Sequence, residues 1–335
     1  MLSYYELKRH ILSESAKKKI PVGGEFELTG KCNLQCKMCF VQDERISPLS
    51  TEQWKKIFDD AYKHGLVYAL LTGGEVLTRS DFLELYNYLY DLGVRITVYT
   101  NGTLITEKIA QAFQMRPPEM VGITLYGSNN QIYEQVTGNN NGFTLVNRGI
   151  DILQKYKINL FVRTIPIKPI MEDLDNIIAY VKQKKLPMQY SLYVGPSRVK
   201  SGSEYGERLN PKQLLEYEKK MIDAIGRANN REFRYSTNGF TCIALKSAYF
   251  ITAQGRMQPC AMLIHPSKSV VSNDFFEVWN ELSKLIDKIN GCRSCSVCKY
   301  NTHCIQCPAK LYLEGGFTKC SKYLHDIAKL RKANI

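Results

Sequence analysis

Short apolar runs alternate with longer amphipathic stretches between residues 20 and 195, and this alternation limits the possible folds more than any other feature of the chain. The runs are 25–28, 67–71, 94–99, 120–125, 159–164 and 189–193. Each has the length of a strand, and the stretches between the runs have apolar residues at helical spacing. Strands that alternate with helices form parallel sheets with crossover helices, so the predicted fold class is α/β.

Predicted helices lie between these runs. The clearest begins at Ser50, which has Gln53 three residues later in a capping-box pattern, and stops before Gly65. Further helices are predicted over 80–92, 106–113, 143–156, 171–184, 211–228 and 321–333. Parallel α/β folds place their chemistry at the carboxyl ends of the strands, so motifs that follow a predicted strand are the candidates for function.

The composition and the start of the chain exclude several classes of protein. Apolar residues make up 44%, which suffices for a large core, and no apolar run approaches the roughly 20 residues that span a bilayer. The first residues lack the basic and then apolar pattern of a secretory signal, so we expect a cytoplasmic protein with no membrane partner. The basic residues behind the net charge of +13 are spread along the chain without a nucleic-acid-binding motif, so nucleic acid is not an expected partner.

Eleven cysteines fall into two groups. Three follow the first predicted strand: Cys32, Cys36 and Cys39. Eight follow position 240: Cys242, Cys260, Cys292, Cys295, Cys298, Cys304, Cys307 and Cys320. Without an export signal a disulfide framework does not explain this grouping, so the cysteines predict metal binding. Eleven thiolates on three four-iron cores would lower the net charge from +13 to about +8.

The first group has the spacing CxxxCxxC on a short loop after a strand. Three thiolates so placed can hold three irons of a four-iron cubane. The fourth iron is then open to a small ligand, as a site for chemistry requires. The alternative from spacing alone is a zinc loop whose fourth ligand lies elsewhere.

With Met38 in its apolar slot, the first group resembles the signature of the radical S-adenosylmethionine (SAM) superfamily. Later motifs resemble that family in the same order after successive predicted strands: Thr72-Gly73-Gly74-Glu75 (GGE), Thr100-Asn101-Gly102-Thr103 (TNG) and the hydroxyl residue Thr124. The resemblance covers about residues 20–195 and implies a partial (β/α)6 barrel. It implies that a SAM-binding [4Fe–4S] cluster is held by Cys32, Cys36 and Cys39. It further implies that SAM contacts Gly73, Gly74, Glu75, Asn101 and Thr124.

One position departs from the family pattern. Relatives often have an arginine about a dozen residues past the hydroxyl residue to hold the SAM carboxylate, whereas this chain has Val136 and Thr137 there. Arg163, at the end of the fifth predicted strand, is the predicted substitute. The alternative is that Arg163 forms a simple salt bridge.

The second group is similar to the SPASM extension of radical SAM enzymes. Cys242 is followed by twelve residues, Gly255, four residues and Cys260, and after a gap come CxxCx5CxxC and a last cysteine. The resemblance implies an outer auxiliary [4Fe–4S] cluster on Cys295, Cys298, Cys304 and Cys320, and an inner one on Cys242, Cys260 and Cys307. The tail from residue 237 on has few helix or strand signals, so metal is expected to supply its folding energy.

Cys292 is additional to this pattern, and the last spacing is one residue shorter than in relatives. We predict that Cys292 completes the inner cluster. Alternatively, Cys292 is a free thiol that gives a hydrogen atom to a substrate radical, or one inner iron is left for a substrate thiolate. A tail that binds zinc is a further alternative.

The resemblance divides the chain into an N-terminal extension (1–20), a radical SAM barrel (21–195), a linker loop with a bridging helix (196–236) and a SPASM domain with a C-terminal helix (237–335). It implies an oxidoreductase that splits SAM into methionine and a 5′-deoxyadenosyl radical. Three [4Fe–4S] clusters and a reductant such as flavodoxin or ferredoxin are implied with it. The predicted substrate is a ribosomally made precursor peptide, which receives a thioether or carbon–carbon crosslink or is epimerised. Alternatives are a formylglycine-generating, sulfatase-type maturase and a non-catalytic iron–sulfur or zinc binding module.

Overall fold

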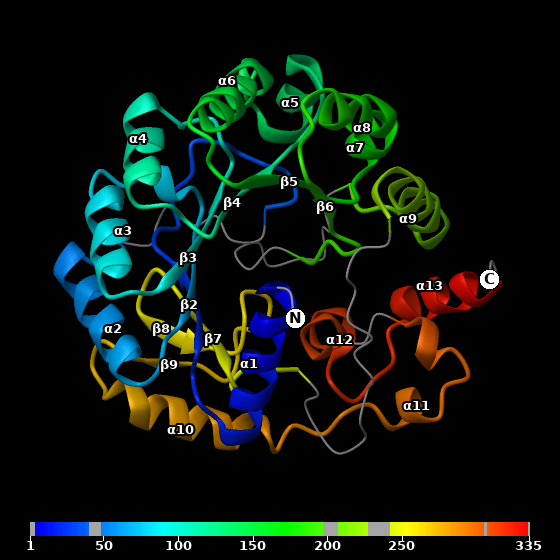
Figure 1. Cartoon of the computed structure of the whole chain (residues 1–335). Coiled ribbons are helices and arrows are strands. Elements are labelled where there is room, and N and C mark those ends of the chain that lie inside the picture. Colours follow the sequence, from blue (N-terminus) through cyan, green and yellow to red (C-terminus); the bar gives the residue numbers. More distant parts are fainter. Residues whose placement is uncertain (1–3, 40–47, 197–206, 227–241, 305–306, 334–335) are drawn as a thin grey trace.

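A computed structural model describes residues 4–39, 48–196, 207–226, 242–304 and 307–333. Within these residues the strands form one sheet in the order β6-β5-β4-β3-β2-β1-β7-β8-β9. The first strands along the chain are parallel and form an open arc (Figure 1): β1 (Gly23–Glu27), β2 (Tyr68–Thr72), β3 (Arg95–Thr100), β4 (Met120–Thr124), β5 (Leu160–Thr164) and β6 (Met188–Tyr190). Each overlaps its predicted range, and the arc is the predicted partial barrel.

The helices that connect these strands cover the outer side of the arc (Figure 1). They are α2 (Thr51–Lys63), η1 (Val76–Thr78), α3 (Phe82–Asp91), α4 (Glu107–Met115), α5 (Asn130–Thr137), α6 (Gly142–Lys155), α7 (Lys168–Glu172) and α8 (Leu174–Gln183). Phe26 of β1 faces this layer, since its ring packs edge-on against Trp54 and Phe58 of α2 at centroid distances of 6.2 and 5.1 Å. Successive side chains of a strand point to opposite faces. Glu25 and Glu27 therefore point to the inner side of the arc, which we call the lumen.

The predicted capping box at the start of α2 is confirmed. The Ser50 hydroxyl oxygen accepts a hydrogen bond from the Gln53 backbone N–H at 3.2 Å, and the Gln53 side-chain oxygen accepts one from the Ser50 N–H at 3.0 Å. Such a cap is worth about 1 kcal/mol. It begins the helix soon after the segment that carries the first cysteine group, and so it fixes one end of that segment.

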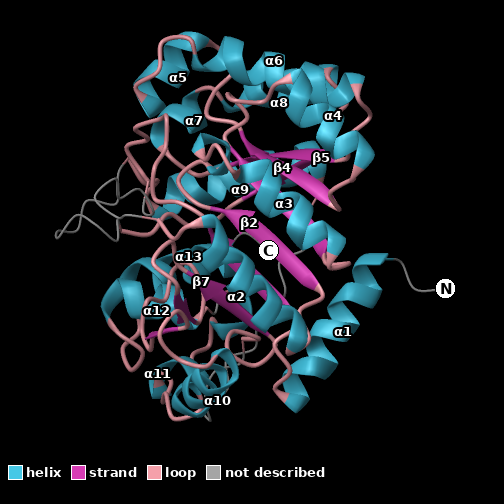
Figure 2. Cartoon of the chain, turned by 90° about the vertical axis from the view of Figure 1, so that its left-hand side faces the viewer, coloured by secondary structure: helices cyan, strands magenta, loops and turns pink. Residues whose placement is uncertain are grey.

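The sheet continues past the barrel into the cysteine-rich tail. β7 (Ala248–Ile251) pairs in parallel with β1, and β8 (Arg256–Gln258) and β9 (Lys268–Ser269) follow antiparallel. The remaining helices are α1 (Tyr4–Lys18), α9 (Pro211–Ile225), α10 (Phe275–Ile286), α11 (Arg293–Ser296), η2 (Asn301–His303), α12 (Pro308–Gly315) and α13 (Lys322–Ala333). Figure 2 shows α10, α11 and α12 in the lower half of the view, the half that also holds β7. Among the described helices, none combines the length and the apolar composition needed to cross a membrane.

The structure differs from the sequence-based prediction at four places. The predicted N-terminal extension contains the helix α1, which is not predicted. α5 is not predicted, because it is only 8 residues long. The predicted helix over 171–184 is divided at Asp173, whose carboxylate accepts hydrogen bonds from the Ser128 N–H and hydroxyl at 2.6 and 2.7 Å. The tail contains more regular structure than predicted, since Trp279 of α10 is fully buried and packs against Tyr249 of β7 at 5.9 Å. Apolar burial therefore contributes to the folding of the tail.

A partly buried ion pair holds the tail to the barrel. Arg208, which precedes α9, pairs with Glu314 of α12 at 2.5 Å, and its guanidinium lies 3.7 Å from the ring centroid of Tyr323 on α13. The hydroxyl of Tyr193, just past β6, donates to the same Glu314 oxygen at 3.0 Å. One carboxylate thus joins the end of the last barrel strand, the segment before α9 and a tail helix through charge-assisted hydrogen bonds.

Candidate active site

The loop after β1 carries the first cysteine group: Cys32, Cys36 and Cys39. It lies at the carboxyl end of the parallel strands, where chemistry is expected. The backbone N–H groups of Gln35 and Lys37 donate to the carbonyl oxygens of Thr137 and Val136 at 2.9 and 3.1 Å, and thereby hold the loop to the end of α5. The two residues that stand in place of the expected arginine therefore support the cysteine loop through their backbone.

The three thiols interact with one another electrostatically, while among the described residues no three His, Cys, Asp or Glu side chains meet as a metal site would require. Burial, with a smaller contribution from the neighbouring thiols, raises the pKa of Cys32 to about 11 and that of Cys36 to about 12. A positive metal core would remove this cost, since metal ions bind the thiolate form. Two donors already point at the Cys32 sulfur, namely Leu34 N at 3.4 Å and Asn101 Nδ2 at 3.8 Å. The donor set therefore fits the iron–sulfur cluster that the motif implies.

The GGE turn after β2 lies in direct backbone contact with the cysteine loop. Gly74 N donates to Thr29 O at 2.7 Å, and Glu75 N donates to Lys31 O at 2.8 Å. A Cβ atom on Gly74 would lie only 2.2 Å from Lys31 O. Glycine is required here because any side chain would push the loop away from the turn. The contact of Gly73 and Gly74 with SAM stays a prediction.

The Glu75 side chain is turned into the protein, and both its oxygens are engaged there. Its carboxylate accepts hydrogen bonds from the Thr100 hydroxyl at 2.7 Å, from Asn101 N at 2.6 Å and from Leu77 N at 3.1 Å. Burial raises the pKa of Glu75, and these hydrogen bonds counter the shift in part. Glu75 therefore ties the GGE turn to the TNG turn. Its predicted contact with SAM stays a prediction beside this positioning role.

Asn101 of the TNG turn links the third strand to the cysteine loop. Besides its contact with Cys32, its Nδ2 donates to Asn33 Oδ1 at 2.9 Å, and its Oδ1 accepts from Thr103 N at 3.0 Å. Asn33 Nδ2 donates in turn to the Thr103 hydroxyl at 2.8 Å. Two asparagines thus hold the backbone and sulfur of Cys32 in place. Sequence reasoning missed Asn33, whose only signal is its position next to Cys32.

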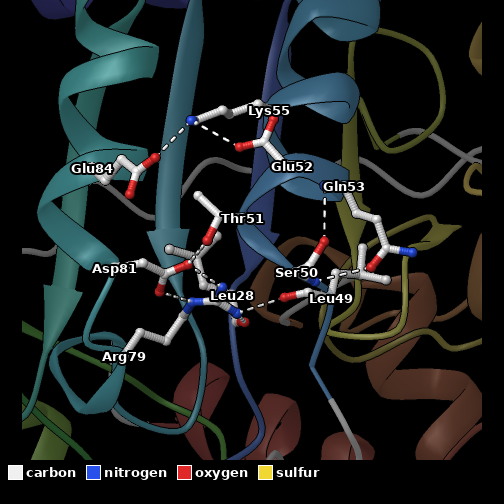
Figure 3. A network of polar contacts seen from close by, with 10 residues as sticks. All are labelled: Leu28, Leu49, Ser50, Thr51, Glu52, Gln53, Lys55, Arg79, Asp81 and Glu84. Atoms are coloured by element: carbon white, nitrogen blue, oxygen red, sulfur yellow. Dashed lines mark hydrogen bonds and ion pairs between the residues drawn. The ribbon is translucent and has the colours of Figure 1, made fainter.

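Arg79 joins the two ends of the segment that carries the first cysteine group (Figure 3). Its Nη1 donates to the carbonyl oxygens of Leu28 and Leu49 at 2.9 and 3.0 Å. Leu28 ends the stretch that leads out of β1, and Leu49 precedes the cap of α2. The guanidinium is 9% exposed, so these hydrogen bonds are shielded from water. Arg79 therefore closes the base of the cysteine loop, because it holds together the two chain segments at which the loop begins and ends.

Asp81 holds the Arg79 guanidinium in this position. Its two oxygens accept from Arg79 Nε and Nη2 at 2.8 and 2.6 Å, and one of them also accepts from the Thr51 hydroxyl at 2.6 Å (Figure 3). Burial raises the pKa of Asp81, but the hydrogen bonds from Arg79 and Thr51 outweigh it, so the net shift is downward. Sequence reasoning missed both residues; the available signal was their place directly after the GGE turn.

The lumen brings two of the predicted SAM contacts together. Thr124 and Arg163 are neighbours in the pairing of β4 with β5, and Arg163 Nε donates to the Thr124 hydroxyl oxygen at 3.1 Å. The guanidinium lies 4.1 Å from the ring centroid of Tyr99, which is a cation–π distance. Among the described residues Arg163 forms no ion pair, so its remaining N–H groups are available to an anion. Its contact with the SAM carboxylate stays a prediction.

Replacing Glu25 by glutamine is expected to raise thermal stability most at alkaline pH. Burial raises the pKa of the Glu25 carboxyl to about 7, and Arg163, which faces it across the lumen, counters this shift only in part. The folded protein thus keeps a proton that the unfolded chain releases near pH 4.5, so stability falls as the pH rises from about 4.5 to about 7. Melting curves at about pH 5 and about pH 8 check this. An equal gain in Tm at both values would contradict it.

The tail cysteines gather at two places. Five thiols interact with one another: Cys292, Cys295, Cys298, Cys304 and Cys320. Cys260 interacts instead with Cys307, and burial raises the pKa of Cys260 to about 12. Cys292 is fully buried and lies beside Cys295 and Cys320, in the group predicted to hold the outer cluster. The ligand assignments of both auxiliary clusters stay predictions.

Cys292→Ala separates the two roles considered for this residue. If Cys292 is the fourth ligand of the inner cluster, its removal should lower the iron content by roughly four irons per chain. We expect the iron content to stay at about twelve per chain, because four other thiols surround the outer site without Cys292. Iron and sulfide analysis of the anaerobically reconstituted variant measures this. Loss of one cluster would restore Cys292 to the inner set.

Comparisons with known proteins agree with this geometry. Residues 26–181 match the family model of the radical SAM superfamily. An AdoMet-dependent heme synthase of Methanosarcina barkeri is 23% identical over 321 residues, which are 87% of this chain and 92% of that protein. The antilisterial bacteriocin subtilosin biosynthesis protein AlbA of Bacillus subtilis is 23% identical over 328 residues, which are 93% of this chain and 71% of that protein.

A solved structure extends the likeness to the tail. Streptococcus suis SuiB bound to its precursor peptide SuiA has a TM-score of 0.70 at 16% identity, over 96% of this chain and 81% of that chain. At this identity the likeness concerns the fold, which is a partial barrel followed by a small cysteine-rich region, as predicted. The motif order, the family model and the fold agree that residues 26–181 form a radical SAM domain.

Proposed function

We propose that this protein is a SPASM-type peptide maturase. It uses SAM to remove a hydrogen atom from a residue of a ribosomally made precursor peptide, and so introduces a thioether or carbon–carbon crosslink or inverts a stereocentre. The observation that carries the proposal is the cysteine loop, which is fixed against the GGE turn, the TNG turn and Arg79. The names of two relatives support a peptide substrate, since AlbA serves bacteriocin biosynthesis and SuiB binds a precursor peptide.

A cluster on Cys32, Cys36 and Cys39 would supply an electron to bound SAM and release methionine and a carbon-centred radical. The residues of the chain then have three tasks. The Gly73 and Gly74 backbone and Thr124 hold SAM, and Arg163 neutralises its carboxylate. The lumen keeps water and small thiols from the radical. Flavodoxin or ferredoxin is the proposed source of electrons, and the tail cysteines hold two auxiliary clusters.

Heme synthesis is the second candidate function. It is favoured by one observation, namely that the Methanosarcina barkeri heme synthase aligns with 87% of this chain. The two functions differ in their substrates, because a porphyrin is a flat macrocycle that carries carboxylates, whereas a peptide is extended and carries amides. A single enzyme preparation can therefore be offered both.

The test uses full-length protein reconstituted with iron and sulfide, SAM and dithionite under anaerobic conditions. Formation of 5′-deoxyadenosine and methionine establishes SAM cleavage, and zinc without SAM cleavage would refute the enzyme function. The enzyme is then incubated with peptides encoded by short reading frames beside its gene, and separately with a carboxylated iron porphyrin.

Mass spectrometry distinguishes the outcomes. Loss of two hydrogens from a peptide indicates a crosslink, and deuterium uptake from heavy water at unchanged composition indicates epimerisation. A hydrazide-reactive aldehyde indicates the formylglycine alternative. Conversion of the porphyrin but of none of the peptides would overturn the peptide-maturase proposal in favour of the second candidate.

A further inference from the structure

Glu25 is a lumen carboxylate that the mechanism above does not use. It is half-buried, and its neighbours in the sheet register are the apolar Leu70 of β2 and Phe250 of β7. Among the described residues, its carboxylate makes no hydrogen bond and no ion pair. Glu27, the next residue on the same face of β1, does have a partner, since it accepts from Ala253 N at 3.2 Å. A shielded carboxylate without a partner is costly and is commonly explained by a ligand.

Glu25 lies where a substrate could contact it, between the cysteine loop and Cys260. Glu25 is the middle residue of β1, and the carboxyl end of this strand leads to the cysteine loop. At the other end lies Cys260, because β8 runs antiparallel and Gln258 is level with Phe250 and so with Glu25. Arg163 and Cys260 both interact with Glu25 electrostatically, from the two sides of the lumen. Glu25 thus lies near both a predicted SAM contact, Arg163, and a predicted ligand of the inner cluster, Cys260.

The charges that face each other across the lumen restrict the chemistry of the bound group. A lone cation beside Glu25 would be repelled by the guanidinium of Arg163, and a substrate carboxylate beside Glu25 would be repelled by Glu25 itself. A neutral group with an N–H donor satisfies Glu25 without either repulsion. Of the two candidate substrates, the peptide offers such groups along its backbone, whereas the carboxylates of a porphyrin would be repelled.

We propose that Glu25 accepts a hydrogen bond from a backbone amide of the peptide substrate, and so positions the residue that loses hydrogen. This rests on the proposed peptide-maturase function and adds the contact that orients the substrate. Burial raises the pKa of Glu25 to about 7. A hydrogen-bond donor that reached the carboxylate would stabilise its charged form.

The first experiment compares Glu25→Gln with Glu52→Gln, which removes an equal charge from the exposed surface of α2. All proteins are reconstituted, and iron content and circular dichroism verify that they are loaded and folded. We expect Glu52→Gln to form 5′-deoxyadenosine at the wild-type rate without peptide, and both variants are assayed with peptide at saturating SAM so that only the KM for peptide is compared. With a peptide that the wild type converts, Glu25→Gln should raise KM roughly fivefold to thirtyfold, because glutamine keeps an acceptor oxygen but loses its charge, and Glu52→Gln should leave KM unchanged.

The second experiment identifies the amide. Each backbone N–H of the converted peptide is replaced in turn by an ester oxygen. One replacement should raise KM with the wild type and should raise it less with Glu25→Gln, because the uncharged glutamine oxygen accepts the same hydrogen bond more weakly. Wild-type KM in Glu25→Gln, or additive effects at every position, would overturn this proposal alone. A wild-type enzyme that converts no peptide would overturn it together with the maturase function.

Discussion

Replacing Cys36 by alanine is expected to abolish SAM cleavage and to leave the tail intact. Cys36 is the most strongly shifted thiol of its loop, and the hydroxyl of Tyr126 hydrogen-bonds to it. Two remaining thiolates cannot hold a cubane with one open iron, so the site for SAM is lost. We expect 5′-deoxyadenosine formation to fall at least about a thousandfold, which corresponds to about 4 kcal/mol of transition-state stabilisation.

The iron content distinguishes this result from general unfolding. About eight of about twelve irons per chain should remain on the tail cysteines of Cys36→Ala. Cys292→Ala is the matched control, since it removes a buried thiol that is expected to be dispensable for iron binding. Rapid SAM cleavage by Cys36→Ala would show that the loop is not the reaction centre, and the proposed chemistry would fall with it.

Replacing Arg79 by alanine is expected to have the second-largest effect, although none of the hydrogen bonds described for Arg79 is to a cysteine. The change removes both hydrogen bonds that close the base of the cysteine loop and leaves Asp81 without its guanidinium. Loss of one partner from a pair that is 9% and 19% exposed should cost about 2–4 kcal/mol, since complete burial costs somewhat more. The loop should then hold its cluster poorly, so iron should fall toward eight of about twelve.

Two further variants separate the loop contacts from the ion pair. Lysine at position 79 keeps the charge but has no planar fork, so Arg79→Lys should recover part of the stability and little of the iron. The double variant Arg79→Ala/Asp81→Ala removes the unpaired charge. If Arg79 acts by closing the loop, the double variant regains some Tm but stays short of iron. If the double variant recovered both the wild-type Tm and the wild-type iron content, Arg79 would serve only to neutralise Asp81.

The barrel could be predicted from the sequence because its signals are local and repeated. Each strand is an apolar run, and the helices between them show caps and periodicity, as at Ser50 and Gln53. The tail could not be predicted as well. Its strands are short, and α10 has a capping residue, Asp274, and a buried apolar face that the abundance of cysteines obscured.

The motifs of the site could be predicted, but the side chains that hold them in place could not. Cysteine spacing and glycine turns are visible in a sequence because chemistry fixes both residue type and interval. Arg79 and Asn33 act through contacts with segments far along the chain, such as Leu49 and Thr103. Glu25 is visible only once the sheet register shows what lies beside it. No local pattern encodes such long-range contacts.

The pairing of β1 with β7 has a consequence for electron flow. The cysteine loop follows the carboxyl end of β1, and β8 runs toward the other end before Cys260, so a strand of 5 residues lies between the two groups of cysteines that are predicted to hold clusters. Such a strand spans about 17 Å, and its length is set by covalent geometry and ladder hydrogen bonds. If both groups of cysteines hold clusters, β1 keeps the distance between the two clusters constant, while the loops and substrates around the strand change.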